Sequence, residues 1–222
     1  ENNTFFYQPP GTKTKYVTFS GYDRNTLTIA EIKTSSRVYL RWDYKSERGA
    51  FVYGERSANA AIPTKGTGSF NGDMIATMVF NPNLDIDPTT PTYFQWIAGS
   101  ATTKVDFAAN SFKIDLGGTV LAPQISDQYT DGRYTLQAGA IFAAAGAGRI
   151  DLINAGGFLG SINSASFVQP NGTRFDLAIA GSSVDGAFFG PAAEEVGGGF
   201  RIVGGTPDER IDIVGAFTGK QP

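Results

Sequence analysis

The chain has 222 residues, of which 41% are hydrophobic and 18% are charged, and its formal net charge is −3. This length suits one sizeable hydrophobic core or two small ones, and the composition is that of a globular protein. Because the sequence contains no Cys and no His, it excludes disulfides, zinc fingers and catalysis through Cys–His or Ser–His–Asp arrangements.

Charge is distributed unevenly along the chain. Residues 1–60 carry a formal charge of +3 and residues 61–222 one of −6. The acidic overall balance argues against nucleic acid as a partner. Two interpretations of the basic N-terminal part stay open: ordinary solvated side chains, and a mildly cationic surface that meets an acidic partner.

Alternation of apolar and polar residues with a period of two predicts β-strands over much of the chain. Thr26–Lys33 and Arg37–Tyr44 are two such segments. In the second, four apolar residues share one face: Val38, Leu40, Trp42 and Tyr44. A third segment, Phe70–Phe80, mixes bulky and very small residues on one face, as the inner wall of a tight barrel requires.

The composition changes near residues 60–64. Before this point the chain is richer in Lys, Arg and Tyr, and after it Gly and Ala dominate. We therefore place a domain boundary here, between an N-terminal β segment, residues 1–60, and a C-terminal β domain, residues 61–222.

The segment Asn81–Thr92 contains three prolines and no strand pattern, which predicts a surface loop of the kind that carries binding residues. Oxygen-bearing side chains alternate within it, and Asn83, Asp85 and Asp87 are candidate calcium ligands. The pattern lacks the Gly and the distal Glu of a helix-loop-helix calcium site. The alternative interpretation is turn-forming residues at the end of a strand.

Aromatic residues gather at the ends of two segments. Phe5, Phe6 and Tyr7 precede a Pro-Pro pair, and the group after Pro91 comprises Tyr93, Phe94 and Trp96. They either cap the ends of a small barrel or line an interface, where Tyr and Trp are enriched.

From residue 101 onward the sequence pattern predicts further short strands at regular spacing, which indicates an antiparallel barrel or sandwich. The predicted strands are Ala101–Phe107, Ser111–Leu116, Tyr134–Ala143, Arg149–Asn154, Gly157–Val168, Thr173–Ala180, Val184–Gly190, Gly199–Val203 and Arg210–Phe217. Ala192–Val196 is the one segment that favours a helical turn.

The residue patterns do not favour an enzyme. Ser161, Ser182 and Ser183 have no imidazole partner, and no nucleophile motif surrounds them. Glu194 and Glu195 are adjacent, so on a helical turn they point about 100° apart and do not easily share one substrate bond. A carboxylate pair brought together from distant strands is the arrangement that sequence alone leaves open.

One run is specific enough to indicate a family. The residues from Gly186 to Phe200, Gly-Ala-Phe-Phe-Gly-Pro-Ala-Ala-Glu-Glu-Val-Gly-Gly-Gly-Phe, resemble the signature of the C-terminal barrel of the transferrin-binding protein B-like family. The closing segment Ile211–Gln221, the hairpin Val105–Leu116 and the segment Phe51–Gly68 resemble the same family. The resemblance covers residues 50–221, while residues 1–50 match only as a short handle-like β segment.

This resemblance implies an antiparallel up-and-down barrel of about eight strands with a filled interior. The family includes bacterial surface lipoproteins, factor H-binding protein and haemophore relatives, which act as binders and carry no chemistry. Haemophore relatives ligate haem through His, which this chain lacks, so haem would need Tyr, Met or no axial ligand. The resemblance also implies that Glu194 and Glu195 mark the fold and not a ligand site.

We therefore expect an all-β, non-enzymatic binding protein of the Gram-negative cell surface or of the secreted fraction. Its partner is expected to be a nutrient such as iron, haem or another small solute, or a host or partner protein at an outer-membrane receptor. Contacts are expected from the handle and the neighbouring loops, through aromatic anchors and a cationic rim. The candidate ligand-binding residues are Arg41, Trp42, Tyr44, Tyr93, Phe94 and Trp96.

Two alternatives remain at this stage. One is a structural or adhesion module of the cell surface with no small ligand. The other is an integral outer-membrane barrel, which is disfavoured because several strands carry polar residues on both faces and the chain ends in Lys220-Gln221-Pro222 without a terminal aromatic residue. We expect no cofactor unless the calcium interpretation holds, and no segment that crosses a membrane as a helix.

Overall fold

A computed structural model describes residues 2–8, 13–81, 93–123, 136–206 and 209–222. Within these ranges the chain is all β apart from one short 3-10 helix, as predicted. The elements in chain order are β1 (Asn2–Tyr7), β2 (Val17–Lys33), β3 (Val38–Gly54), the 3-10 helix η1 (Asn59–Ala61), β4 (Thr67–Asn81), β5 (Tyr93–Asp106), β6 (Ser111–Val120), β7 (Ile141–Asp151), β8 (Gly157–Val168), β9 (Arg174–Asp176), β10 (Ala178–Phe189), β11 (Glu195–Thr206) and β12 (Glu209–Lys220).

The described strands form two antiparallel sheets. The first has the order β1-β2-β3, and we call it the handle. The second has the order β10-β11-β12-β4-β5-β6-β7-β8-β9, and an additional pairing of β10 with β8 closes it into a barrel of eight strands with β9 as an extra strand. The predicted up-and-down barrel with a small N-terminal handle is therefore confirmed.

The barrel closes around a core of its own side chains. On β4 the residues Phe70, Met74, Ala76 and Met78 are buried in this core, on the face that the alternation predicted. Aromatic rings from other strands contact one another in this core, with centroids 4.8 Å apart for Phe112 of β6 and Phe158 of β8. Further ring pairs in the core are Phe158–Phe188 at 5.6 Å and Phe142–Phe167 at 5.2 Å.

The two adjacent phenylalanines of β10 point to opposite sides of the barrel wall. Phe188 lies in the barrel core, whereas Phe189 packs on the outside with Val17 of the handle. Since side chains alternate along a strand, one residue of this pair must face outward. The handle covers that outward ring, which explains why both phenylalanines are almost fully buried.

Four local predictions were wrong. The strands expected at 173–180 and 184–190 are instead the short strand β9, Arg174–Asp176, and the long strand β10, Ala178–Phe189. The strands expected at 134–143 and 149–154 are replaced by the single strand β7, Ile141–Asp151, because its Ala/Gly-rich middle continues through a bulge between Ala145 and Gly146 instead of bending. The segment expected to form a helical turn, Ala192–Val196, forms an irregular turn, and β11 begins within it at Glu195. The strand expected at 101–107 begins earlier, at Tyr93.

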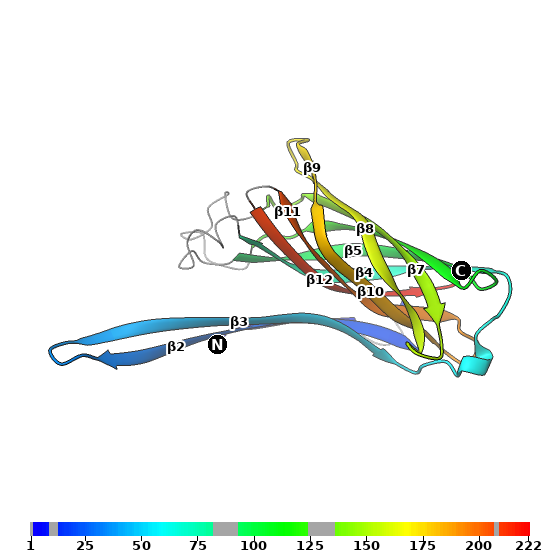
Figure 1. Cartoon of the computed structure of the whole chain (residues 1–222), viewed down its shortest axis with the longest axis horizontal. Coiled ribbons are helices and arrows are strands. Elements are labelled where there is room, and N and C mark those ends of the chain that lie inside the picture. The colour runs from blue at the N-terminus through cyan, green and yellow to red at the C-terminus, as the bar shows by residue number, and fades with distance from the viewer. Residues whose placement is uncertain (1, 9–12, 82–92, 124–135, 207–208) are drawn as a thin grey trace.

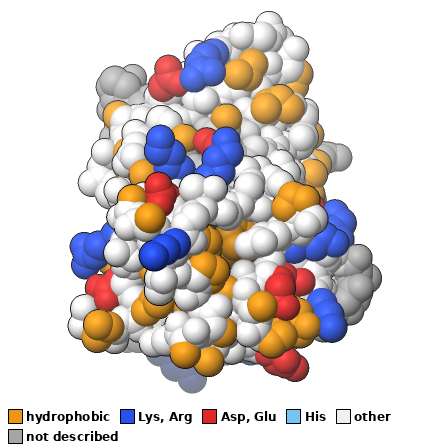
Figure 2. Space-filling model, turned by 90° about the vertical axis from the view of Figure 1, so that its right-hand side faces the viewer, with side chains coloured by type: hydrophobic (Ala, Val, Ile, Leu, Met, Phe, Trp, Pro, Cys, Tyr) orange, Lys and Arg blue, Asp and Glu red, His pale blue; other side chains and the backbone are white. Residues whose placement is uncertain are grey.

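The handle lies along the outside of the barrel and extends beyond it. Its strands β2 and β3 have 17 residues each and pair along their whole length. The half of this hairpin near Val17 and Gly54 contacts β4, β11 and β12, and the other half projects past the barrel (Figure 1). At the opposite end of the molecule, acidic and basic side chains are spread around a middle region in which hydrophobic side chains are visible (Figure 2).

Candidate functional site

The handle is attached to the barrel through an apolar contact. Phe19 of β2 is buried together with Ile75 of β4, Trp96 of β5 and Ala216 of β12. The Trp96 ring lies directly against the backbone of Gly21, where an added Cβ would come within 2.6 Å of the ring. Only a glycine at this position therefore lets the handle approach the barrel closely.

A buried carboxylate fixes the start of β2. Glu195, which is 3% exposed, accepts hydrogen bonds from the backbone N–H groups of Lys15, Tyr16 and Val17 at 2.5, 2.7 and 3.0 Å. The carboxylate therefore supplies an acceptor for three successive backbone N–H groups, of which that of Val17 belongs to a buried residue. One of the two glutamates of the family-like run thus joins the handle to the barrel.

A second polar contact lies further along the handle. The Arg48 guanidinium donates to the Thr77 hydroxyl at 2.7 Å and to the Thr77 and Asp212 carbonyl oxygens at 3.0 and 3.2 Å. Burial lowers the pKa of Arg48, and the nearby Asp212 carboxylate, 3.5 Å away, opposes this effect. Asp212 also pairs with Arg201 at 2.9 Å. These polar contacts therefore join β3 of the handle to the barrel strands β4, β11 and β12.

The surface of the handle that faces away from the barrel is aromatic. Five exposed rings from all three strands lie on it: Phe5, Tyr7, Tyr22, Phe51 and Tyr53. We call this surface the aromatic face. Phe5 and Phe51 are 61% and 44% exposed, which is unusual for side chains of this size in a protein without a partner.

The rings of the aromatic face contact one another. Centroids are 6.4 Å apart for Phe5 and Tyr7, 6.5 Å for Tyr22 and Phe51, and 6.0 Å for Phe51 and Tyr53. A hydrogen bond with Tyr53 raises the pKa of Tyr7 above its ordinary value. The Tyr22 ring covers Gly49, where an added Cβ would come within 2.8 Å of it. Mutual packing of this kind holds the rings in place before a partner arrives.

The projecting half of the hairpin adds exposed apolar side chains. Ile29, Ile32, Val38, Tyr39 and Leu40 are each 43% or more exposed. The turn at its end is closed by the Thr34 N–H, which donates to the Arg37 carbonyl oxygen at 2.9 Å. The handle thus presents apolar side chains both alongside the barrel, on the face that points away from it, and beyond the end of the barrel.

A hollow of about 370 Å³ lies where the edge of β3 meets the barrel. Tyr53 and Arg56 line it from the handle side, and Asp185 and Phe189 line it from β10. Loss of hydration raises the pKa of the Asp185 carboxyl. In the described part of the chain this carboxylate has no ion-pair partner.

The structure separates the six predicted ligand-binding residues into two groups. Arg41, Trp42 and Tyr44 belong to the projecting half of β3, while Tyr93, Phe94 and Trp96 belong to the first residues of β5. Trp96 is 1% exposed and lies beneath the handle. It therefore reaches a partner only if the handle moves, and in this structure it positions the handle. The side chains of the other five residues lie outside what the structure describes.

The predicted calcium ligands Asn83, Asp85 and Asp87 lie outside the described residues, so that interpretation stays a prediction. Among the residues that the structure does describe, no group of three or more acidic side chains is placed to hold a metal ion. Nor does this part of the chain contain a helix with the length and apolar character that crossing a membrane requires.

The aromatic face was only partly identified from the sequence. Phe5 and Tyr7 were candidates for an interface, whereas Tyr22, Phe51 and Tyr53 were not. The signal was available, because Phe5-x-Tyr7 and Phe51-x-Tyr53 share the spacing that puts two rings on one face of a strand. What the spacing could not show is that the opposite face is covered by the barrel, which leaves the rings in solvent.

Comparison with known proteins places most of the chain in one family. Residues 62–221 match the family model described as the C-lobe and N-lobe β-barrels of Tf-binding protein B. No curated protein matches the chain.

Several solved structures are similar to the chain. A double mutant of the vaccine antigen transferrin-binding protein B from Haemophilus parasuis Hp5 is 16% identical, with a TM-score of 0.44, over 100% of this chain and 37% of that one. Intact Ap-TbpB, with N and C lobes, is 14% identical, with a TM-score of 0.44, over 99% and 39%. The isotype 1 protein from serogroup B Neisseria meningitidis is 13% identical, with a TM-score of 0.38, over 97% and 36%. The chain thus spans well under half the length of each.

Proposed function

This chain belongs to the family of the C-lobe and N-lobe β-barrels of transferrin-binding protein B, and on that premise we propose that it is a non-enzymatic binding protein that captures a protein partner through the aromatic face of its handle. The observation that carries the proposal is the set of five exposed, mutually packed rings on that face. Rigid Tyr and Phe side chains are the residue types that anchor protein interfaces.

The barrel interior favours an outer binding surface over a small ligand in the lumen. Its core is filled by side chains from every strand of the closed barrel, among them Phe112, Phe142 and Phe217, each no more than 2% exposed. A lumen filled with side chains is not where we expect a solute of haem size to bind. The handle, by contrast, offers large apolar side chains to solvent on its outward face and along its projecting hairpin.

Charge supports the same surface. Residues 1–60, which include the handle, carry a net charge of +3 in a chain whose total is −3. Fields of this kind steer an acidic partner toward the basic part of the molecule and raise the rate of association. Capture at the cell surface or after secretion is the setting that fits this function, and the proposal assigns no cofactor.

Transferrin is the partner to test first, because the related structures are named for binding it. The experiment measures binding of the full chain to immobilised transferrin by biolayer interferometry. The double variant Phe51→Ser/Tyr53→Ser removes two aromatic anchors and is expected to weaken binding about a hundredfold. The matched control, Ile141→Ser/Ile153→Ser, removes two exposed apolar side chains from the barrel and should bind like the wild type.

The two parts of the proposal fail separately. If the wild-type chain shows no saturable binding, transferrin is not the partner. If the aromatic double variant binds as tightly as the control variant, the aromatic face is not the binding surface.

A further inference from the structure

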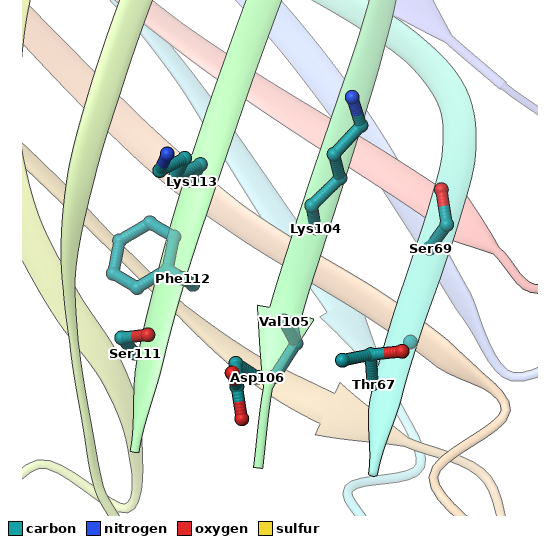
Figure 3. Close-up of a pocket in the computed structure, with 9 residues that line it drawn as sticks. Thr67, Ser69, Lys104, Val105, Asp106, Ser111, Phe112 and Lys113 are labelled. Atoms are coloured by element: carbon teal, nitrogen blue, oxygen red, sulfur yellow. The ribbon is translucent and has the colours of Figure 1, made fainter. Parts of the chain in front are cut away.

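A second surface of the barrel carries an unusual arrangement of charge. A hollow of about 600 Å³ lies on the outer wall at the start of β4, the end of β5 and the start of β6. Six outward-facing polar side chains line it in two rows that run across the three strands: Ser69, Lys104 and Lys113 in one row, and Thr67, Asp106 and Ser111 in the other (Figure 3).

The first row places two lysines at paired positions of adjacent strands. Lys104 and Lys113 are direct cross-strand partners, and Ser69 is the partner of Lys104 on its other side. Like charges directly opposite each other destabilise a sheet. Both lysines are exposed, and neither makes an ion pair within the described residues. An anion between them would remove the repulsion.

The second row supplies hydroxyl donors. Thr67 and Ser111 flank Asp106 on the neighbouring strands. The Asp106 carboxylate accepts the Ala109 N–H at 3.0 Å and so holds the turn between β5 and β6. The next acidic residue on this wall, Asp115, is paired in register with Thr102, one step beyond the lysine row. Two ammonium groups, three hydroxyl groups and the Asp106 carboxylate, which the Ala109 N–H engages, therefore surround the hollow.

We propose that this hollow binds a phosphate group, which Lys104 and Lys113 pair with and to which the Ser69 and Ser111 hydroxyls donate. Two positive charges with neighbouring hydroxyls match the charge and the acceptor oxygens of a phosphate. The site is independent of the aromatic face. Lys13, which precedes β2, pairs with Asp73 of β4 at 2.7 Å, and the hollow lies before that point on the strand.

The place of the hollow on the molecule bears on the source of the phosphate. The parts of β4, β5 and β6 that line it lie at the end of the barrel opposite to the projecting hairpin (Figure 1). A phosphate ester in a lipid headgroup and a soluble phosphate ester offer the same chemistry to the two lysines, so the experiment treats them as separate arms.

The first arm follows backbone amide NMR shifts of the full chain during titration with sodium phosphate, against sodium chloride at equal ionic strength and pH. Shifts specific to phosphate are expected at Ser69, Lys104 and Lys113. Lys104→Gln and Lys113→Gln are each expected to weaken binding about fivefold, the factor for one solvent-exposed charged contact. Lys33→Gln, at the far end of the hairpin, is the control for the lost charge.

The second arm measures flotation with phosphatidylcholine vesicles that contain phosphatidic acid, against pure phosphatidylcholine. Flotation that Lys104→Gln reduces identifies a lipid source, whereas phosphate-specific shifts without flotation identify a soluble ester. The proposal is overturned if the phosphate-induced shifts are spread over all cationic residues. It is also overturned if Lys104→Gln and Lys113→Gln bind phosphate as Lys33→Gln does. Thermal melting of each variant verifies that it is folded.

Discussion

Glu195 illustrates how one side chain can determine where a whole segment lies. Its carboxylate faces three backbone N–H groups, and no other acceptor for the Lys15 and Tyr16 N–H groups appears among the described contacts. Glu195→Gln keeps the size of the side chain but replaces one acceptor oxygen with an NH₂ group. This group is itself a hydrogen-bond donor and would face the backbone N–H donors. We expect a loss of about 2 kcal/mol in the free energy of unfolding, with faster hydrogen exchange at Lys15, Tyr16 and Val17.

The neighbouring glutamate provides the control. Glu194 is half-buried, and its carboxylate accepts the Ala192 N–H at 2.9 Å, the one hydrogen bond of this carboxylate within the described residues. Glu194→Gln should therefore leave exchange at the start of β2 unchanged. Equal exchange rates in the two variants would contradict the role assigned to Glu195.

Trp96 shows how the handle and the barrel depend on each other. The ring fills the space between Gly21 on β2 and Ile75 on β4. Trp96→Ala leaves a cavity there, and such substitutions cost about 3–5 kcal/mol. Because the ring lies between the sheets and not inside the barrel, we expect the loss to appear as detachment of the handle, measured as increased hydrogen exchange in β2 and β3 with β6 to β8 unchanged.

Measuring the affinity for the partner distinguishes two roles of Trp96, positioning the handle and contacting the partner directly. If Trp96 acts by positioning the handle, Trp96→Ala weakens binding in proportion to the detached fraction, and Trp96→Phe restores most of it. If Trp96→Phe holds the handle in place as the wild type does yet fails to bind the partner, the positioning role is contradicted. The sequence-based prediction that Trp96 contacts the partner directly is then favoured.

Strands were predicted well wherever one face is buried and the other is exposed to solvent, as on β4 and β6. There the alternation of apolar and polar residues indicates which side chains face the core. The prediction failed on β7, where Ala and Gly alternate with each other and give no contrast between the faces. It also placed the start of β5 at Ala101, whereas that strand begins at Tyr93. In each case the information lay in pairing with a neighbouring strand.

The candidate site was harder to predict for a related reason. The environment of Trp96 depends on Phe19, and that of Glu195 depends on the backbone of Lys15, contacts between residues far apart in the sequence. A tryptophan after a proline-rich loop looks like a surface anchor until the covering strand is known. The outward rings of the handle were likewise ambiguous, since the sequence does not show which face of the small sheet meets the barrel.

Closure of the barrel makes the last strand indispensable to the whole molecule. β12 pairs with β11 on one side and with β4 on the other, so it joins the C-terminal end of the chain to the first strand of the barrel. Its outward residues Asp212 and Ala216 also contact the handle. Three parts of the protein therefore meet on a single strand, and pairing over such a sequence separation is formed only when the rest of the barrel is in place.

Deletion of residues 209–222 is accordingly expected to abolish the cooperative thermal transition, because it exposes two unpaired barrel edges and the core around Phe217 together. Deletion of residues 1–7 removes β1, which pairs only with β2 at the outer edge of the handle, and should lower the melting temperature by only a few degrees. Circular dichroism in the near and far ultraviolet distinguishes these outcomes. A cooperative transition in the protein without β12 would show that the barrel closes by another pairing.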